Sequence, residues 1–284
     1  MTDKIIAVDC SPPVMDAING IFGNEILLEA ESFRNIRELK DYRMIIIQEG
    51  IDNAEILKRI RKLRYACYFR NMPIVVVKPD AYAGSIESYI TAGATEVISM
   101  NDPPAACRQI LKGHLIPDRQ PLKEEMEYID TFVRHTCNVL KTVASLDTSF
   151  EEVYFANDFK IFGDVSGLIA LTGGADGILG ITFYWPLAQK IIARMMGTAE
   201  DKINAELIHD GVAEIVNMIG GSTKNDLVGK PYHFEISLPS VILGGGHQLG
   251  HAEKCPIAVI IFKVDYQYFA LQICLKPNKR GGRH

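Results

Sequence analysis

One stretch of the chain, residues 204–228, constrains the fold and the chemistry more than any other. It reads NAELIHDGVAEIVNMIGGSTKNDLV, and its branched apolar residues recur at intervals of three and four positions. These residues are Ile208, Val212, Ile215 and Ile219. Such spacing lines one face of a helix with 3.6 residues per turn. The stretch is therefore predicted to form a long amphipathic helix with a buried apolar stripe.

A polar stripe lies almost opposite the apolar one. Asp210, Glu214 and Asn217 follow the same spacing, so they are expected to face outward together. Gly221 continues this stripe by one turn and Gly220 lies beside it, which predicts a bare polar surface there. A carboxylate can pair with a lysine or arginine, whereas a carboxamide donates and accepts hydrogen bonds without titrating near neutral pH. A carboxamide is therefore suited to hold a water molecule in a fixed direction, as a glutamine does in GTP hydrolysis.

The polar stripe has an alternative interpretation as the ordinary solvated face of a surface helix. A glutamate and an asparagine three residues apart form a very short pattern, and short patterns often arise by chance. Taken alone, the residues of this helix leave both interpretations open.

The sequence around the helix resembles one protein family. The pattern D-x3-E-x2-N at residues 210–217, followed by Pro239 in the run FEISLPSVILG, resembles the signature of the CheX/CheC family. The run FGDVSGLIALTGGADGILGITF at residues 162–183 and the strands predicted after the motif also resemble CheX. The resemblance spans residues 125–276. It implies an α+β domain in which long helices pack on a mainly antiparallel sheet.

Members of this family dephosphorylate response regulators such as CheY. The resemblance therefore implies an enzyme that hydrolyses the aspartyl phosphate of a separate, phosphorylated CheY-like regulator. It implies that Asn217 orients the attacking water and that Glu214 pairs with the conserved lysine of the regulator, with Asp210 and Pro239 in supporting roles. No cofactor or metal is expected in this chain, because the partner regulator supplies Mg²⁺. A homodimer is also expected.

A second long helix is predicted at residues 123–146, and it carries a faded copy of the motif. Thr131, His135 and Asn138 stand at the spacing of the three motif residues. The CheC branch of the family carries two such helices, whereas CheX keeps one. Since His135 replaces the glutamate, the activity is assigned to the helix at 204–228 only.

The first half of the chain alternates short apolar runs with helical segments. Five buried strands separated by helices predict a doubly wound α/β domain with a parallel sheet. The strands are predicted at 4–9, 26–29, 44–48, 74–78 and 96–100, and the helices at 13–23, 33–41, 53–69, 84–92 and 104–113. The run VVV after Met72-Pro73 and the run Ala92-Gly93-Ala94 resemble the receiver domain of response regulators.

The active-site positions of a receiver are altered in this sequence. Gln48 stands where the phosphate-accepting aspartate should end the third strand, and Cys10 replaces the second acid of the metal pocket. Lys78 and Met100 stand at the usual threonine or serine and lysine positions, which leaves Glu49 as the only nearby acid that could accept phosphate. This degenerate receiver is therefore predicted not to be phosphorylated on aspartate.

The sequence predicts two domains with a linker between them. The run LIPDRQPL at residues 115–122 contains two prolines, and no helical or strand pattern of apolar residues continues across it. The expected division is a receiver-like domain at 1–117, a linker at 118–124, a CheX-like domain at 125–277 and a flexible tail at 278–284.

Composition narrows the environment and the partners. The formal net charge is −5 without long blocks of like charge, which argues against nucleic acid or a membrane surface as the partner. The six cysteines are scattered and lack a C-x-x-C pair, as is typical of reduced cysteines in a cytoplasmic protein. Neither a signal peptide nor an apolar run long enough to span a membrane is found, so a cytoplasmic location is expected.

Two further interpretations stay open. In the first, the chain is a non-catalytic binding module for a response regulator, and the degenerate receiver serves as a docking or regulatory element that could mask the polar stripe. In the second, glycine clusters at 173–174, 177–180 and 244–246 belong to a nucleotide-dependent enzyme. None of these clusters fits a phosphate-binding glycine motif, so hairpin turns are predicted there instead.

Overall fold

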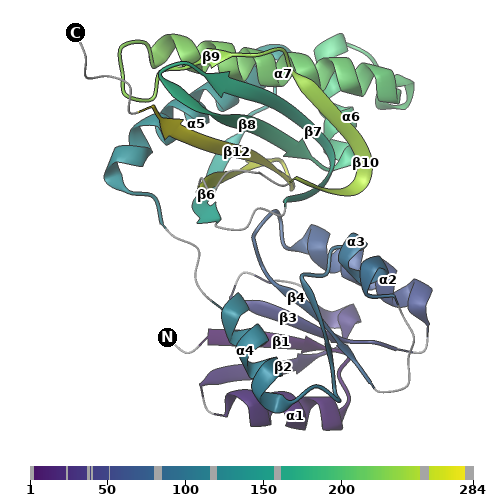
Figure 1. Cartoon of the computed structure of the whole chain (residues 1–284). Coiled ribbons are helices and arrows are strands. Elements are labelled where there is room, and N and C mark those ends of the chain that lie inside the picture. Colours follow the sequence, from purple (N-terminus) through teal and green to yellow (C-terminus); the bar gives the residue numbers. More distant parts are fainter. Residues whose placement is uncertain are drawn as a thin grey trace. The chain divides into compact units, whose positions relative to one another are not determined.

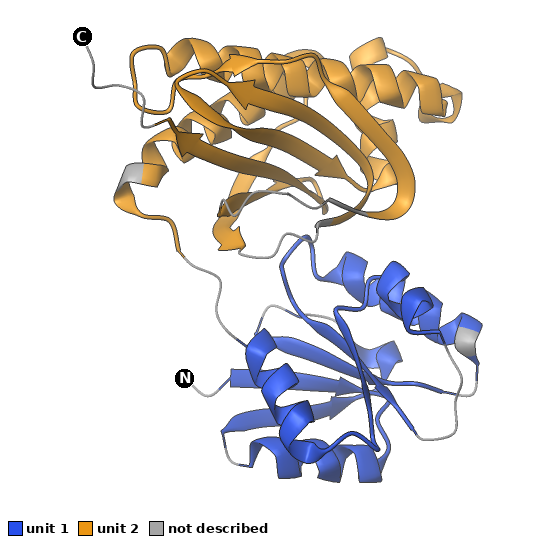
Figure 2. Ribbon diagram, viewed as in Figure 1, with its two compact units in different colours: residues 1–117 blue, residues 118–284 orange. Residues whose placement is uncertain are grey.

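The computed structural model describes residues 3–23, 25–36, 39, 41–50, 52–79, 85–115, 120–156, 161–249 and 256–278. The chain divides into two compact units, Met1–Pro117 and Asp118–His284 (Figure 2). The predicted linker at 118–124 begins outside the described residues, and the predicted tail lies outside them from residue 279 onward. Each unit is described separately below.

Unit 1 is a parallel sheet with helices on both faces. Among its described residues, the strand order is β2-β1-β3-β4-β5, and all neighbouring strands run parallel (Figure 1). The elements are β1 (Asp3–Val8), α1 (Pro12–Phe22), β2 (Ile26–Glu31), the 3₁₀ turn η1 (Phe33–Asn35), β3 (Met44–Gln48), α2 (Asn53–Ala66), β4 (Ile74–Lys78), α3 (Ile86–Thr91), β5 (Glu96–Ser99) and α4 (Pro104–His114). The predicted doubly wound fold is confirmed, and this strand order is that of flavodoxin-like domains.

The core of unit 1 lies on both faces of the sheet. Along β3, Ile45 and Ile47 pack into one apolar cluster, while Met44 and Ile46 pack into the other. All four side chains are almost completely buried. A strand buried on both faces reads as a continuous apolar run, which is why MIII was recognisable in the sequence.

The helix predicted at residues 33–41 is wrong in its extent. The described part of this segment forms only the short turn η1, and Ile36 already has extended backbone angles, with φ −64° and ψ 116°. Phe33, Ile36 and Leu39 all contact the same apolar cluster. Their common interval of three residues resembles a helical period, although here it reflects three separate contacts with the core.

Unit 2 places long helices on an antiparallel sheet. Its elements are α5 (Lys123–Ala144), β6 (Ser149–Ala156), β7 (Ile161–Thr172), β8 (Ala175–Phe183), α6 (Trp185–Met196), the 3₁₀ turn η2 (Glu200–Lys202), α7 (Ala205–Asp226), β9 (Glu235–Ile236), β10 (Ser240–Leu249), β11 (Ile257–Val264) and β12 (Gln267–Pro277). Within the described ranges, the strand order is β10-β7-β8-β12-β11-β6, with β9 paired to β7, and all these pairs are antiparallel. The predicted α+β class is confirmed.

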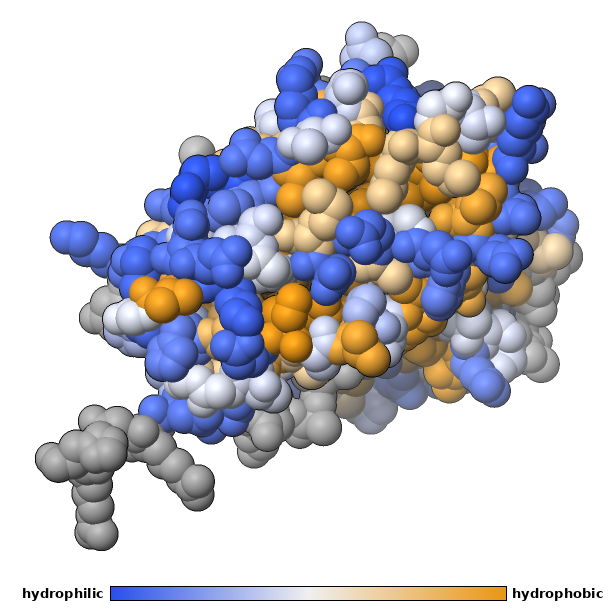
Figure 3. Space-filling view, turned by 90° about the horizontal axis from the view of Figure 1, so that it is seen from above, coloured by the Kyte–Doolittle hydropathy of each residue, from blue (hydrophilic) through white to orange (hydrophobic). Residues whose placement is uncertain are grey.

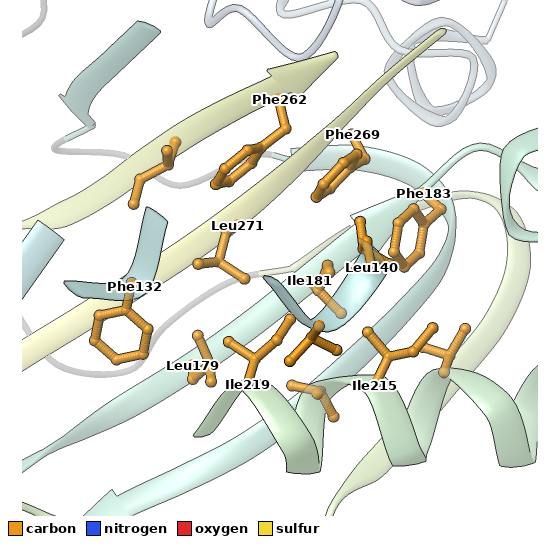
Figure 4. Packing of buried hydrophobic residues seen from close by; sticks show 14 of the residues in the cluster. Phe132, Leu140, Leu179, Ile181, Phe183, Ile215, Ile219, Phe262, Phe269 and Leu271 are labelled. Atoms are coloured by element: carbon orange, nitrogen blue, oxygen red, sulfur yellow. The ribbon is translucent and has the colours of Figure 1, made fainter. Parts of the chain in front are cut away.

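The core of unit 2 lies between this sheet and helices α5, α6 and α7 (Figure 1). Figure 4 shows side chains from α5 and α7 meeting those of the sheet. The aromatic rings of Phe262 and Phe269 stack with their centroids 4.9 Å apart. This single large core fixes α7 on a rigid support.

Helix α7 forms for reasons that are visible in its sequence. The side chain of Asn204 accepts a hydrogen bond from the backbone N–H of Leu207 at 2.9 Å and caps the helix. Glycine at position 167 allows the helix to approach the sheet closely. A Cβ atom there would lie 2.9 Å from Cγ1 of Val212 and 3.2 Å from Cγ1 of Val216. The helix therefore rests directly on the backbone of β7.

Two parts of unit 2 differ from the sequence prediction. Strand β6 was not predicted, because SFEEVYFA contains three exposed residues at its start and gives only a weak strand signal. The glycines at 177 and 180 lie within β8, and the cluster at 244–246 lies within β10 where the strand register shifts, so neither cluster forms a hairpin turn. A Cβ atom on Gly177 would lie 1.8 Å from the carbonyl oxygen of Cys274, so this glycine permits close packing of neighbouring strands. The prediction of a turn holds at Gly173, which joins β7 to β8 with φ 111°.

Candidate functional site

The polar and apolar stripes of α7 lie where the sequence places them. The side chains of Ile208, Val212, Ile215 and Ile219 are 0% exposed. Asp210 and Glu214 are exposed, and Asn217 is partly buried. The carboxylate of Asp210 lies 3.0 Å from Nδ1 of His209. The three polar residues thus share the solvent side of a helix whose other side is fixed in the core.

The segment joining β9 to β10 lies beside the C-terminal half of this polar stripe. Ile236 of β9 contacts Gly220 and approaches Gly221, the glycines one turn beyond Asn217. Val241 of β10 pairs with Gly167, which lies beneath Val212 and Val216. Strands β9 and β10 both contact α7 (Figure 1), and Pro239 belongs to the short connection between these two strands. The fold thus brings Pro239 next to the motif helix.

Gly220 differs from the sequence prediction of a bare polar surface. It is buried, and a Cβ atom there would lie 3.4–3.8 Å from side-chain atoms of Ile236, Leu179 and Ile169. These are ordinary van der Waals distances, so this position faces the core and β9 and not the solvent. Gly221 is only partly buried and does continue the outward-facing stripe.

Ionic and polar contacts fix the elements around the stripe. Lys224 near the end of α7 pairs with Glu235 of β9. At Ser237 the backbone N–H donates to the carbonyl oxygen of Ala170 at 3.0 Å, and its hydroxyl accepts from the N–H of Ala170 at 3.0 Å. The segment before Pro239 is therefore held to both α7 and β7.

Helix α5 carries the faded copy of the motif, and there Thr131 and His135 make contacts within unit 2. Nε2 of His135 lies 2.9 Å from the carboxylate of Asp226, and Arg134 also pairs with this carboxylate at 2.9 Å. These contacts, the hydrogen bond from His135 first among them, lower the pKa of Asp226. Thr131 is buried and donates to the carbonyl oxygen of Glu127 at 2.9 Å. The contacts join α5 to the end of α7, and they explain the histidine without a catalytic role.

The motif residues offer polar groups to an approaching molecule. Within the described part of the chain, the side chains of Glu214 and Asn217 make no hydrogen bond or ion pair. An unpaired carboxylate and an unpaired carboxamide one turn apart can bind a cation and orient a water molecule, respectively. In the same residues, no group of three histidine, cysteine, aspartate or glutamate side chains gathers as a metal site would require.

The residues predicted to stand at the active-site positions of a receiver make contacts within unit 1. The carboxamide oxygen of Gln48 accepts a hydrogen bond from the backbone N–H of Ser11 at 2.7 Å. Asp9 pairs with Arg59 at 2.6 Å. Burial raises the pKa of the Cys10 thiol to about 12, so this thiol is neutral at physiological pH. Together, these three side chains do not form the open cluster of carboxylates that binds Mg²⁺ in a receiver.

Glu49, the acid that could have accepted phosphate, is withdrawn into the core. It is 1% exposed, and its carboxylate accepts a hydrogen bond from the hydroxyl of Tyr89, which is also buried. A phosphate donor in solution does not reach a carboxylate in this position.

Sequence reasoning overlooked one residue beside the site. Leu238 precedes Pro239 and is 89% exposed, which is unusual for a leucine in an ordered segment. The signal in the sequence was weak, since EISLPSVIL reads as a strand with leucine in its interior. Its exposure depends on the break between β9 and β10, which the strand pattern alone does not reveal.

No helix among the described residues is both long and apolar enough to cross a bilayer.

Comparisons with known proteins agree on unit 2. The family model described as "Chemotaxis phosphatase CheX" matches residues 165–263, which include most of β7, all of α7 and the β9–β10 segment. A chemotaxis protein CheX from Desulfovibrio desulfuricans is 32% identical, and the match covers 53% of this chain and 99% of that one, with a TM-score of 0.49. A chemotaxis protein CheX from Vibrio vulnificus is 33% identical, with coverage of 53% and 99% and a TM-score of 0.49. A search of curated proteins found no match.

A more distant structure is the CheX–CheY–BeF₃–Mg²⁺ complex from Borrelia burgdorferi. It is 19% identical, and the match covers 52% of this chain and 97% of that one, with a TM-score of 0.46. Family membership rests on the family model and on the sequence identity over nearly the whole length of the two closer proteins. The chain belongs, through its C-terminal unit, to the CheX family.

Proposed function

We propose that this chain is a phosphatase that hydrolyses the aspartyl phosphate of a separate, CheY-like response regulator. The observation that carries the proposal is the placement of Glu214 and Asn217, which lie unpaired, one turn apart, on the solvent side of a helix whose opposite side is completely buried. Its family, described as a chemotaxis phosphatase, supplies the reaction class.

Asn217 is proposed to orient the attacking water. Its carboxamide oxygen accepts a hydrogen bond from the water, and its N–H₂ group donates to an oxygen of the phosphoryl group. The water oxygen then bonds to phosphorus as the bond to the aspartyl oxygen breaks. The aspartate leaves as a carboxylate, and one proton of the water passes to a phosphoryl oxygen, so that inorganic phosphate is released. Phosphoryl transfer of this kind depends mainly on positioning and charge stabilisation, so a neutral side chain is sufficient. Mg²⁺ belongs to the acidic pocket of the regulator in this proposal.

Glu214 is proposed to hold the two proteins in register. Its exposed carboxylate pairs with a lysine of the regulator beside the phosphoryl group. Such a pair is formed only in the complex, where partial desolvation strengthens it. Asp210 and Pro239 are proposed to have supporting roles.

The test is the rate at which a phosphorylated CheY-type regulator from the same organism loses its phosphate. Asn217→Ala is expected to lower kcat about 100-fold, because the water loses its fixed direction, and to change Kd less than about threefold. Asn138→Ala is the matched control, since Asn138 is an exposed asparagine at the equivalent position of α5. It should leave both constants unchanged.

Two results would count against the proposal. Equal losses of binding and turnover in Asn217→Ala would indicate a structural role for this residue. Regulators that bind the wild-type protein without any acceleration would instead favour the non-catalytic binding module, with the same helix face as its contact surface.

A further inference from the structure

We infer that Leu238 is the apolar anchor by which this protein binds its regulator, and that Pro239 is the residue that positions it. The inference rests on the proposed function and assigns a role to the proline of the motif. Three observations carry it: the exposure of Leu238, its place between Ile236 and Val241 along α7, and the rigidity of the segment that presents it.

The exposure of Leu238 is the first observation. Its side chain is 89% exposed, more than any other leucine, isoleucine or valine among the described residues. An apolar side chain gains free energy when a partner removes it from water. Figure 3 shows that the face seen from above, on which α7 lies, carries hydrophobic groups among hydrophilic ones. An ordered leucine on such a face can serve as a contact residue.

The position of Leu238 is the second observation. Ile236 lies against Gly220 and Gly221, and Val241 lies level with the Val212–Val216 turn of α7. Leu238 lies in the chain between these two points, in the connection that follows Ile236, whose side chain lies beside the glycines one turn beyond Asn217. A protein that brings a phosphoryl group to Asn217 is therefore expected to meet Leu238 as well.

The rigidity of the segment is the third observation. Ser237 exchanges two hydrogen bonds with Ala170 of β7, and its hydroxyl also donates to the carbonyl oxygen of Leu238 at 2.9 Å. The ring of Pro239 restricts the backbone of Leu238 to extended conformations. A side chain held in one direction loses little conformational entropy on binding, so its burial contributes more fully to affinity.

The same geometry identifies the occupant. A second copy of this chain bound permanently over Leu238 would also cover Asn217 and prevent turnover. The molecule that covers Leu238 must therefore bind and dissociate in each catalytic cycle, as the phosphorylated regulator does. Its contact surface is expected to place an apolar side chain near its phosphorylation site, next to the lysine that meets Glu214.

The experiment measures the affinity of full-length protein for a regulator activated with beryllofluoride, together with kcat on the phosphorylated regulator. Leu238→Ala should raise Kd about tenfold and leave kcat within about twofold, because the lost contact is apolar and remote from the water. Leu238→Met should restore most of the affinity. Pro239→Ala should raise Kd by a smaller factor, since the leucine remains but is less restricted.

Tyr266→Ala serves as the control, because Tyr266 is 93% exposed in the turn between β11 and β12 and should affect neither constant. Unchanged affinity of Leu238→Ala, in a wild-type background that binds and dephosphorylates the regulator, would overturn the inference and leave the proposed function intact. A wild-type protein that fails to bind any regulator would instead remove the proposed function. A changed oligomeric state of Leu238→Ala in sedimentation would assign the leucine to a subunit contact and overturn the inference.

Discussion

Glu214 and Asn217 differ in how firmly the protein holds them. The side chain of Asn217 is partly buried, whereas the side chain of Glu214 is exposed to solvent. A water-orienting group requires a fixed direction, and partial burial restricts its rotamers. A pairing carboxylate can instead adjust as the partner arrives. The two environments therefore suit the two proposed roles.

The pairing role of Glu214 predicts a charge-dependent loss of affinity. Glu214→Lys should raise the Kd for the activated regulator at least about tenfold, because two lysines would then face each other in a partly desolvated interface. Glu214→Ala should have a smaller effect in the same direction. Glu151→Lys changes the net charge equally on β6, at the opposite edge of the sheet from β10, and should have no effect. A Glu214→Lys protein with normal affinity would exclude the ion pair.

The exposure of single residues in the site was predictable from the sequence where it depends only on the helical period. The spacing of Asp210, Glu214 and Asn217 sufficed to place them on one face. The burial of Gly220 was not predictable, because it depends on Ile236, a residue of another element. Burial of Glu49 beneath Tyr89 was missed for the same reason, since a sequence does not show which distant side chain will meet a carboxylate.

At the scale of elements, the site depends on the distance between α7 and strand β7. Gly167 sets this distance, since its hydrogen atom faces Val212 and Val216 where a methyl group would not fit. The long, strongly periodic elements were predicted well, and their ends lie within a few residues of those observed. Strand β6 and the turn η1 were missed because their patterns are short and their conformations depend on contacts with the rest of the core.

The role of Gly167 predicts a specific loss of stability. Gly167→Ala should lower the free energy of unfolding of unit 2 by about 1–3 kcal/mol, because the methyl group overpacks the contact with α7. Gly221→Ala is the matched control within α7, where a Cβ atom would meet only Cδ1 of Ile236 at 4.0 Å. It should stabilise the unit by up to about 1 kcal/mol through helix propensity.

Urea unfolding can be followed for unit 2 alone. The chain contains one tryptophan, Trp185, which begins α6 and packs against the core of unit 2. Its fluorescence therefore reports this unit without interference from unit 1. If Gly167→Ala proved as stable as the wild-type protein, the close contact between β7 and α7 would not limit the packing of the site.

At the scale of the whole molecule, the chain combines a unit in which none of Gln48, Cys10 and Glu49 is predicted to accept a phosphate with a unit that carries a site proposed to remove one. The division near residue 117 was visible in the sequence as an interruption of apolar periods by prolines. The fold of each unit was predictable because it follows from the order and the burial pattern of its strands. The contacts at the positions of unit 1 that correspond to a receiver active site were not predictable. They depend on which side chains replace the acidic residues and on what these side chains contact.

The altered pocket predicts the behaviour of unit 1 toward small phosphate donors. Incubation of the full chain with acetyl phosphate should produce no phosphoaspartate within residues 1–117, while the regulator in the same mixture becomes labelled. Gln48 lacks the carboxylate nucleophile, Cys10 is neutral and does not bind Mg²⁺, and Glu49 is enclosed in the core with Tyr89. Hydroxylamine-sensitive label in this unit, located by mass spectrometry of its peptides, would contradict the prediction. Label on Glu49 would mean that this residue leaves the core and is released from Tyr89, which would make unit 1 a phosphorylation-dependent element and not a fixed one.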